Sequence, residues 1–198
     1  MDNRIKSIEF IEDKHEYWFT DKQGQLRRLY GVTTPIGKLM GKAFPDTVTV
    51  QASVIYGHDV HKESELWIKE GKEPSSEAGK WLVQYLKDFA WVNLVSHYEA
   101  ELLVSDFEKT ASCIDIVAHK EDGKAVLFDI KTTSHFDRAY CSLQLSCYKR
   151  LYEEVYGEEV TEMYVLATKS RRAFRILNQD SSKVQKIFDM NKERDLWK

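Results

Sequence analysis

The chain has little cysteine, no excess of positive charge and no long apolar run. Its three cysteines, Cys113, Cys141 and Cys147, cannot all pair with one another, and none lies in a Cys-x-x-Cys pattern. This scarcity argues against a disulfide framework or a zinc ribbon, and it indicates a reducing cytoplasm. The formal net charge of −3 gives no overall basic field that would indicate a nucleic-acid partner. No membrane span or signal peptide is visible, so we expect a cytoplasmic protein without a membrane partner.

The chain also lacks internal repeats, low-complexity tracts and linkers. Its 198 residues are 42% apolar and 31% charged, an ordinary balance for one globular domain. We therefore expect a single domain over 1–198, made of a β-rich extension over 1–47, a core over 48–178 and a closing helix over 179–198. Strands are predicted at 4–12, 15–20, 26–30, 98–105, 111–119, 124–131, 161–168 and 173–177, with a turn at 32–35. Helices are predicted at 36–41, 48–70, 76–96, 138–156 and 181–194, which gives an α/β fold with one mixed sheet.

The segment 112–131 contains two apolar strands joined by a tight turn, and each strand carries one acidic residue. Glu121–Gly123 fits a three-residue hairpin loop with its glycine in the left-handed conformation. That register places Asp115 opposite Asp129. A two-residue turn would instead place Asp115 opposite Ile130, on the other face, and we favour the three-residue loop.

Asp129 follows the apolar segment 125–128, which is typical of a central strand, and Lys131 shares its face because strand side chains alternate. A bare Asp-x-Lys pattern often marks an exposed salt bridge at a strand end. A charge inside a central strand, however, is costly unless it is paired or metal-bound. With Asp115 directly opposite, two like charges lie about 5 Å apart and repel. The pair therefore predicts a bound cation, and oxygen ligands suit Mg²⁺ or Mn²⁺.

Two further residues could complete such a site. His61 lies on the core-facing side of the predicted helix 48–70, where it is either a core histidine or a ligand that joins the two carboxylates. Glu99 and Glu101 lie in the predicted strand 98–105, next to the hairpin, and each is either a further acidic ligand or a solvated charge; we favour Glu101 as the ligand. The residues alone leave both alternatives open.

Two other groups carry polar side chains that need partners. Gln144 and Tyr148 stand one turn apart on an apolar stripe of the predicted helix 138–156, where a glutamine requires a hydrogen-bond partner and could equally be a core residue. A basic run between the last two strands is either a solvated loop or a phosphate-binding cluster. Its members are Lys169, Arg171, Arg172 and Arg175.

Four of these segments, in this order, resemble the motifs of the PD-(D/E)XK nuclease superfamily and, within it, of the RecB-like exonucleases. Gly57–His61 is similar to the Gly-x-x-x-His helix motif, and Ser112–Asp115 to the Gly-x-x-Asp strand motif, with serine in place of glycine. Asp129–Thr132 resembles the (Asp/Glu)-x-Lys-Thr core, and Gln144–Tyr148 the Gln-x-x-x-Tyr motif. The upstream Tyr30–Thr34 is similar to a segment of some phage members.

The resemblance implies a restriction-endonuclease-like mixed sheet flanked by helices. It also implies a Mg²⁺- or Mn²⁺-dependent exonuclease that hydrolyses DNA from an end, on single-stranded or frayed DNA. The implied metal ligands are His61, Asp115, Asp129 and the Ile130 backbone carbonyl. In the implied mechanism Lys131 positions or deprotonates the attacking water, or stabilises the phosphate in the transition state. Gln144 and Tyr148 orient the lysine or the phosphate.

The resemblance leaves alternatives and partners to be considered. The alternatives are a structure- or sequence-specific endonuclease of the same fold and a catalytically silent DNA-binding domain. Lys149, Arg150 and the basic run over 169–175 would line a narrow passage for a single strand. The three cysteines do not match the four-cysteine pattern of iron–sulfur relatives, and no P-loop or helicase motif is present. We therefore expect a stand-alone, phage-type nuclease in a bacterium or phage-infected cell, with DNA and a recombination, repair or replication protein as partners.

Overall fold

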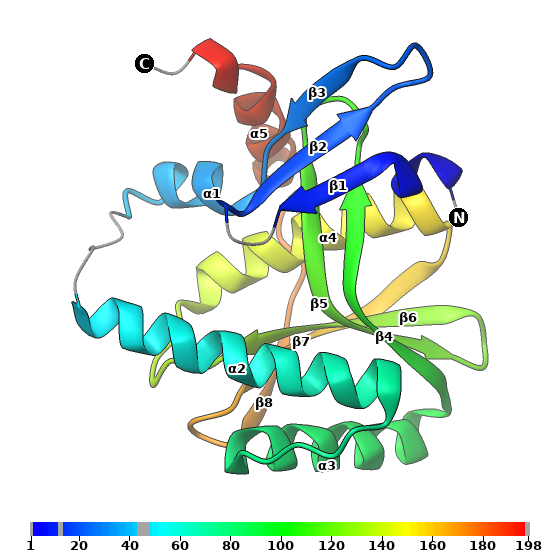
Figure 1. Ribbon diagram of the computed structural model, residues 1–198, viewed down its shortest axis with the longest axis vertical. Coiled ribbons are helices and arrows are strands. Elements are labelled where there is room, and N and C mark those ends of the chain that lie inside the picture. Colours follow the sequence, from blue (N-terminus) through cyan, green and yellow to red (C-terminus); the bar gives the residue numbers. More distant parts are fainter. Residues whose placement is uncertain (1, 12–13, 43–47, 197–198) are drawn as a thin grey trace.

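The computed structural model describes residues 2–11, 14–42 and 48–196, and for 48–56 it describes the backbone alone. Over these residues the chain is a mixed α/β fold with a three-stranded sheet, a five-stranded sheet and five α-helices (Figure 1). None of the helices in these ranges is long and apolar enough to cross a membrane.

The elements follow the chain in two groups. The small sheet contains β1 (Ile8–Ile11), β2 (Glu16–Thr20) and β3 (Leu26–Leu29). The large sheet contains, in spatial order, β4 (Val95–Ser105), β5 (Ala111–Lys120), β6 (Lys124–Lys131), β7 (Glu159–Ala167) and β8 (Arg172–Ile176). The helices are α1 (Thr33–Leu39), α2 (Val48–Glu70), α3 (Glu77–Asn93), α4 (Arg138–Tyr156) and α5 (Ser181–Lys192).

The large sheet is mixed, as the order of elements predicts. Its neighbouring strands are antiparallel except β6 and β7, which are parallel. Parallel neighbours need a long crossover, and α4 provides it. The chain therefore reaches the carboxyl end of β6, crosses through α4, and returns along β7.

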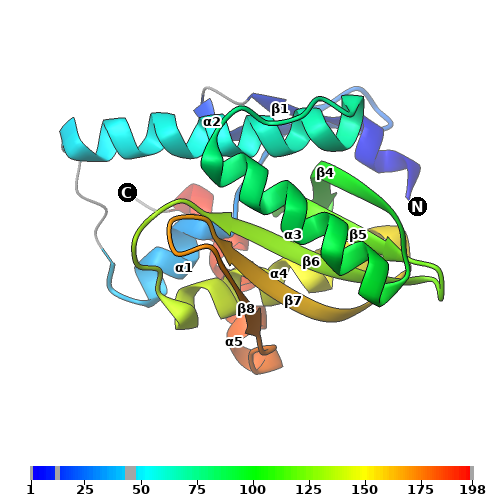
Figure 2. The same ribbon diagram turned by 90° about the horizontal axis from the view of Figure 1, so that it is seen from below.

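Helices cover both faces of this sheet (Figure 2). Alternate side chains of β6 point to opposite faces of the sheet. Leu127 packs in one cluster with residues of α4 and α5, whereas Val126 and Phe128 pack in a second cluster with residues of α2 and α3. Each cluster is built from side chains with almost no exposed surface, so β6 is the central strand that the apolar segment predicts.

The hairpin between β5 and β6 has the predicted three-residue register. Gly123 has a φ of +76°, and its N–H donates to the Lys120 carbonyl at 3.0 Å. The cross-strand pairs run from His119 with Ala125 to Ile116 with Phe128. One step further along the same register places Asp115 across from Asp129.

Helix ends largely follow their sequence signals. Ser76 caps α3, because its side chain accepts a hydrogen bond from the Gly79 N–H. Asp137 caps α4 in the same way, and α4 ends at Gly157, whose φ is +72°. The helix predicted over 48–70 agrees with α2.

Three predicted boundaries are wrong. Residues 4–7 belong to a 3-10 helix (Asn3–Ser7), capped by the Asp2 side chain, rather than to a strand. The predicted turn over 32–35 is instead the start of α1, because a proline is tolerated in the first helical turn, where its missing N–H needs no partner. The helix predicted to reach residue 96 ends before Leu94, whose φ of +52° turns the chain into β4.

Hydrogen bonds from α5 hold the segment that follows the small sheet. Tyr30 forms an isolated bridge with Thr110, just before β5. Asn191 of α5 is fully buried, and its amide donates to the carbonyls of Tyr30 and Gly31 at 3.1 and 3.4 Å. The segment after β3 is thus held between the large sheet and the last helix.

Candidate functional site

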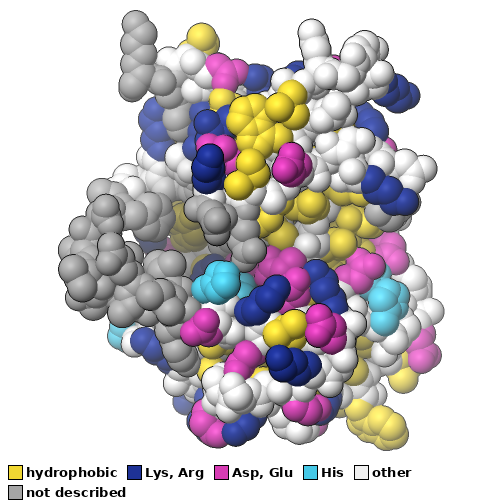
Figure 3. Space-filling model, viewed as in Figure 1, with side chains coloured by type: hydrophobic (Ala, Val, Ile, Leu, Met, Phe, Trp, Pro, Cys, Tyr) yellow, Lys and Arg dark blue, Asp and Glu magenta, His cyan; other side chains and the backbone are white. Residues whose placement is uncertain are grey.

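A cleft of about 510 Å³ lies between the small sheet, α2 and the ends of β5 and β6. Its lining includes every residue predicted as a metal ligand or as a catalytic group. These residues are His61, Glu101, Asp115, Asp129, Ile130, Lys131, Gln144 and Tyr148. The face of the molecule in Figure 3 carries acidic, basic and histidine side chains intermixed, without one broad basic field.

Three potential ligands converge from three different elements. The Nδ1 atom of His61, on α2, lies 3.6 Å from Glu101 Oε1 and 3.7 Å from Asp115 Oδ1. The ligand atoms of these three residues all lie within 4.8 Å of one another. His61 therefore faces the hairpin across the helix–sheet interface, as a ligand must, instead of filling the apolar core.

Glu101 reaches this position through an unusual backbone conformation. Its φ is +53°, and it lies between the cross-strand pairs Ala100 with Ile116 and Leu102 with Ile114. A left-handed φ in a residue other than glycine costs about 1–3 kcal/mol and is concentrated at functional sites. The Cys113 thiol donates to Glu101 Oε2 at 3.2 Å and holds the carboxylate toward the cleft.

Asp129 and Lys131 form a buried pair beside these ligands. Asp129 has only 2% of its surface exposed, and Lys131 Nζ donates to its Oδ1 at 2.9 Å. The other oxygen, Oδ2, lies 2.7 Å from the same nitrogen but accepts no hydrogen bond of good geometry from any described residue. Asp115 is anchored on the same side, because its Oδ2 accepts the Ile130 N–H at 2.6 Å.

Gln144 and Tyr148 extend this pair into a chain of hydrogen bonds. Lys131 Nζ donates to Gln144 Oε1 at 3.5 Å, and Gln144 Nε2 donates to the Tyr148 hydroxyl at 2.8 Å. Both side chains are buried on the apolar stripe of α4. The predicted need for a hydrogen-bond partner is thus met by the lysine of β6.

The electrostatics of the cluster favour a cation. Burial raises the pKa of Asp115 and of Asp129 above the ordinary value for aspartate. Burial opposes protonation of His61, but the carboxylates of Asp115 and Glu101 outweigh it and raise the pKa of His61 to about 9. The pKa of Lys131 is also raised, because the attraction of Asp129 exceeds the effect of burial. The carboxylates of Asp115 and Asp129 therefore depend on nearby positive charge, which His61 and Lys131 supply in part and a bound cation would increase.

The donor set fits a divalent metal ion. It combines the imidazole of His61 with the carboxylates of Glu101 and Asp115. Beside them lies one buried carboxylate oxygen, Asp129 Oδ2, that has no hydrogen bond within the described residues. Carboxylate-rich sets suit Mg²⁺ and Mn²⁺, and an imidazole is compatible with several divalent metals. These acidic and histidine groups could thus hold a metal ion.

The predicted basic residues lie in two different places. Lys149 and Arg150 line a separate hollow of about 380 Å³ beside Gln179 and Val184, and neither lines the cleft. Successive helical residues rotate by about 100°, which turns both side chains away from the direction of Tyr148. Lys149 instead donates to the Val160 carbonyl at 2.6 Å. Their contact with nucleic acid stays a prediction.

The basic run over 169–175 lies nearer the site. The Thr168 N–H donates to the Lys131 carbonyl at 3.0 Å, which places the turn after β7 beside the end of β6. Within the run, Arg171 pairs with Glu77 at 3.5 Å and Arg175 with Glu162 at 3.3 Å.

The sequence does not indicate that the small sheet forms one wall of the cleft. His15 and Tyr17 line it from the small sheet, and the Tyr17 hydroxyl lies 3.5 Å from His15 Nε2. Burial lowers the pKa of His15, so this imidazole favours the neutral form. No local pattern indicates that the β1–β2 hairpin packs over the ends of β5 and β6, because that contact joins segments about a hundred residues apart.

Comparison with known proteins gives only distant likeness. No protein-family model and no curated protein sequence matches the chain. Among solved structures it is similar to an inferred exonuclease from Eubacterium rectale, with 10% identity, 85% of this chain and 79% of that chain covered, and a TM-score of 0.42. It is also similar to the crystal structure of SSO0001, with 16% identity, 84% of each chain covered and a TM-score of 0.36.

Proposed function

We propose that this protein is a Mg²⁺-dependent deoxyribonuclease that removes nucleotides from a DNA end. The observation that carries the proposal is the convergence of His61, Glu101 and Asp115 beside the buried Asp129–Lys131 pair. Carboxylates that hold a divalent cation next to a positioned ammonium are the groups that phosphodiester hydrolysis requires. The four motif segments that resemble the PD-(D/E)XK superfamily meet at this one cleft, which also supports it.

The residues have separate tasks in this proposal. His61, Glu101, Asp115 and Asp129 hold the metal ion, together with the Ile130 carbonyl. The ion, when bound, supplies positive charge that polarises the scissile phosphate and makes the attacking water more acidic. Mn²⁺ would serve in the same set.

Lys131 acts as a fixed donor. Its ammonium has three N–H groups, and it donates to Asp129 and Gln144. The remaining N–H can hold the attacking water or a phosphate oxygen. Gln144 keeps the ammonium in place because Tyr148 fixes its amide from the other side.

The form of the cleft favours a single strand. Its volume of about 510 Å³ is in the range of pockets that enclose a small molecule, which suits one nucleotide of a single strand better than a base-paired duplex. The turn with Lys169, Arg171 and Arg172 lies beside the end of β6, where it could hold the phosphates that follow the scissile bond. We therefore favour cleavage at a single-stranded or frayed end over internal cleavage.

A digestion panel tests this proposal. Labelled linear single-stranded, linear double-stranded and closed circular single-stranded DNA are incubated with the protein, with Mg²⁺ or with EDTA. We expect Mg²⁺-dependent shortening of linear DNA and intact circles. Asp129→Asn and Lys131→Ala should abolish the activity, and Lys183→Ala, an exposed lysine of α5, should retain it. Rapid nicking of circles would favour the endonuclease alternative, and DNA binding without any cleavage would favour the silent binding domain.

A further inference from the structure

A second cluster of metal-binding side chains lies at the other end of the β4–β5 ladder, outside the cleft. His97 and His119 are direct cross-strand partners, and Glu99 follows on the same face of β4. The ligand atoms of the three residues all lie within 4.8 Å of one another. His119 lies four positions after Asp115 along β5, a span of about 13 Å. The two clusters are therefore distinct.

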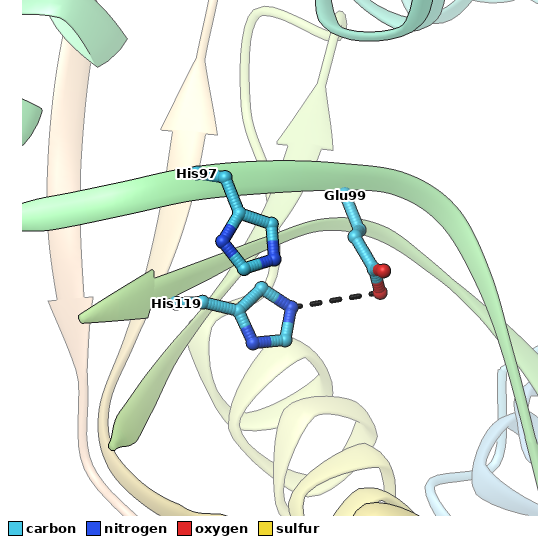
Figure 4. A group of neighbouring side chains, drawn as sticks. All are labelled: His97, Glu99 and His119. Atoms are coloured by element: carbon cyan, nitrogen blue, oxygen red, sulfur yellow. Dashed lines mark ion pairs between the residues drawn. The ribbon is translucent and has the colours of Figure 1, made fainter. Parts of the chain in front are cut away.

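The two imidazole rings are arranged in parallel. Their centroids lie 4.3 Å apart, with an angle of 1° between the ring planes. Figure 4 shows one ring nitrogen of each histidine turned toward the Glu99 carboxylate. The Nδ1 atom of His97 lies 3.0 Å from the Ser96 hydroxyl, which leaves Nε2 as its second ring nitrogen.

His119 has a buried nitrogen with no hydrogen bond. The residue is 9% exposed, and its Nε2 has no hydrogen-bond partner within the described part of the chain. Glu99 lies 3.5 Å from this nitrogen, close enough for the ion pair drawn in Figure 4 but without good hydrogen-bond geometry. Buried polar atoms in proteins nearly always have a hydrogen-bond partner or bind an ion, so this Nε2 of His119 indicates a bound group at this position.

The opposite side of the His119 ring is already oriented. Its Nδ1 lies 2.9 Å from Glu158 Oε2, and the same carboxylate oxygen accepts the Tyr152 hydroxyl. Metal-binding histidines generally donate their other ring N–H to a carboxylate in this way, which fixes the tautomer and leaves a lone pair for the ion. Glu158 directly follows Gly157, the left-handed residue that ends α4, so the end of the helix fixes the position of the Glu158 backbone.

We propose that His97, Glu99 and His119 bind a Zn²⁺ ion. Two imidazole nitrogens and one carboxylate oxygen form a typical three-residue zinc set, with one position left for water, and such a set is softer than the carboxylates that Mg²⁺ prefers. Because imidazole lone pairs lie in the ring plane, the exposed His97 ring would turn out of its parallel arrangement so that its Nε2 and the His119 Nε2 face the same ion. The ion would join the start of β4 to the end of β5, where the register is irregular between Val95 and His97. Through Glu158 it would also be linked to the end of α4. The site would bind its ion whether or not the cleft cleaves DNA.

Metal titration tests the site directly. Co²⁺ serves as an optical probe for Zn²⁺, and a His61→Ala/Asp115→Asn background removes two ligands from the cleft. In that background we expect one equivalent of Co²⁺ to bind, with visible d–d absorption that Zn²⁺ displaces. Adding His97→Ala, a change at an exposed residue, should abolish this absorption, while His135→Ala, another exposed histidine, should preserve it. In the otherwise wild-type chain, His97→Ala should lower the bound Co²⁺ by one equivalent.

Substitution of Glu158, which orients the His119 ring, gives an independent test of the zinc site. Glu158→Gln leaves all three ligands in place but weakens the orientation of the ring, so we expect Zn²⁺ affinity to fall 10–100-fold. Isothermal titration calorimetry with Zn²⁺ would measure the change in Kd. Unchanged Co²⁺ stoichiometry in the His97→Ala chain, or the absence of the visible band in the His61→Ala/Asp115→Asn background, would overturn the proposal.

Discussion

Removing the Lys131 ammonium should destabilise the fold in the absence of metal, and this gives a sharp test of the site. Asp129 is 2% exposed, and its oxygens lie 2.9 and 2.7 Å from Lys131 Nζ. Breaking a buried ion pair by removing one partner costs about 3–5 kcal/mol, because the remaining charge is left uncompensated. A quarter of the Lys131 side chain is exposed, so water can reach the vacated position. We therefore expect Lys131→Ala to lower the free energy of unfolding by about 3 kcal/mol, the lower end of that range.

A second substitution should restore part of the loss. Asp129→Asn added to Lys131→Ala removes the buried charge together with its partner, so the double variant should be more stable than Lys131→Ala alone. Residues in direct contact show interaction energies of about 0.5–3 kcal/mol, and we expect the upper half of that range here. A divalent cation should act in the same direction, by about 2.7 kcal/mol at a concentration 100 times its Kd.

Urea unfolding followed by circular dichroism measures these differences. Wild type, both single variants, the double variant and the control Lys183→Ala are compared in EDTA and in saturating Mg²⁺. The reasoning would be refuted by a double variant no more stable than Lys131→Ala, or by a Lys131→Ala chain that Mg²⁺ does not stabilise. Either result would mean that the Asp129 charge is compensated by some other group.

Two further predictions concern the elements that position the site. Gly57→Ala should lower the rate of DNA cleavage several-fold, because a Cβ at this position would lie 3.0 Å from Thr132 Oγ1 and the Thr132 side chain next to Lys131 would have to shift. Asp59→Ala, an exposed change on the same helix, should have little effect in the same assay. Asp137→Ala should lower the free energy of unfolding by about 1 kcal/mol at neutral pH, because it removes the cap of α4. The hydrogen bond from Lys42 lowers the pKa of Asp137, so its contribution is present above the unfolded pKa and is lost as the pH falls through the lower folded value. Thermal unfolding at pH 7 and at pH 2 should therefore show a difference between wild type and Asp137→Ala that shrinks in acid, and an equal difference at both pH values would contradict this account.

The sequence predicts the centre of the fold well because its signals there are local. The turn glycine Gly123 sets the β5–β6 register, and that register alone places Asp115 across from Asp129. Side-chain alternation then puts Lys131 beside Asp129. Helical spacing puts Gln144 one turn from Tyr148, within hydrogen-bond reach.

The other side chains around the cleft are placed by contacts between segments far apart in the sequence, which no short sequence pattern indicates. Glu101 faces His61 because its φ of +53° breaks the regular twist of β4, and nothing in its own neighbourhood indicates that conformation. His15 and Tyr17 reach the cleft through packing between the two sheets. Lys149 and Arg150 line a different hollow, because the rotation of α4 turns them away from Tyr148.

The contact between Asn191 and Tyr30 has a consequence for how the protein is made. A ribosome delivers the two described sheets before α5, so the amide that holds the Tyr30 and Gly31 carbonyls emerges after the strands it helps to position. Until then the segment that leads from β3 into the cleft lacks the hydrogen bonds from Asn191 to the Tyr30 and Gly31 carbonyls. During synthesis the acidic and basic groups of the cleft are therefore present before α5 can hold the segment that follows β3.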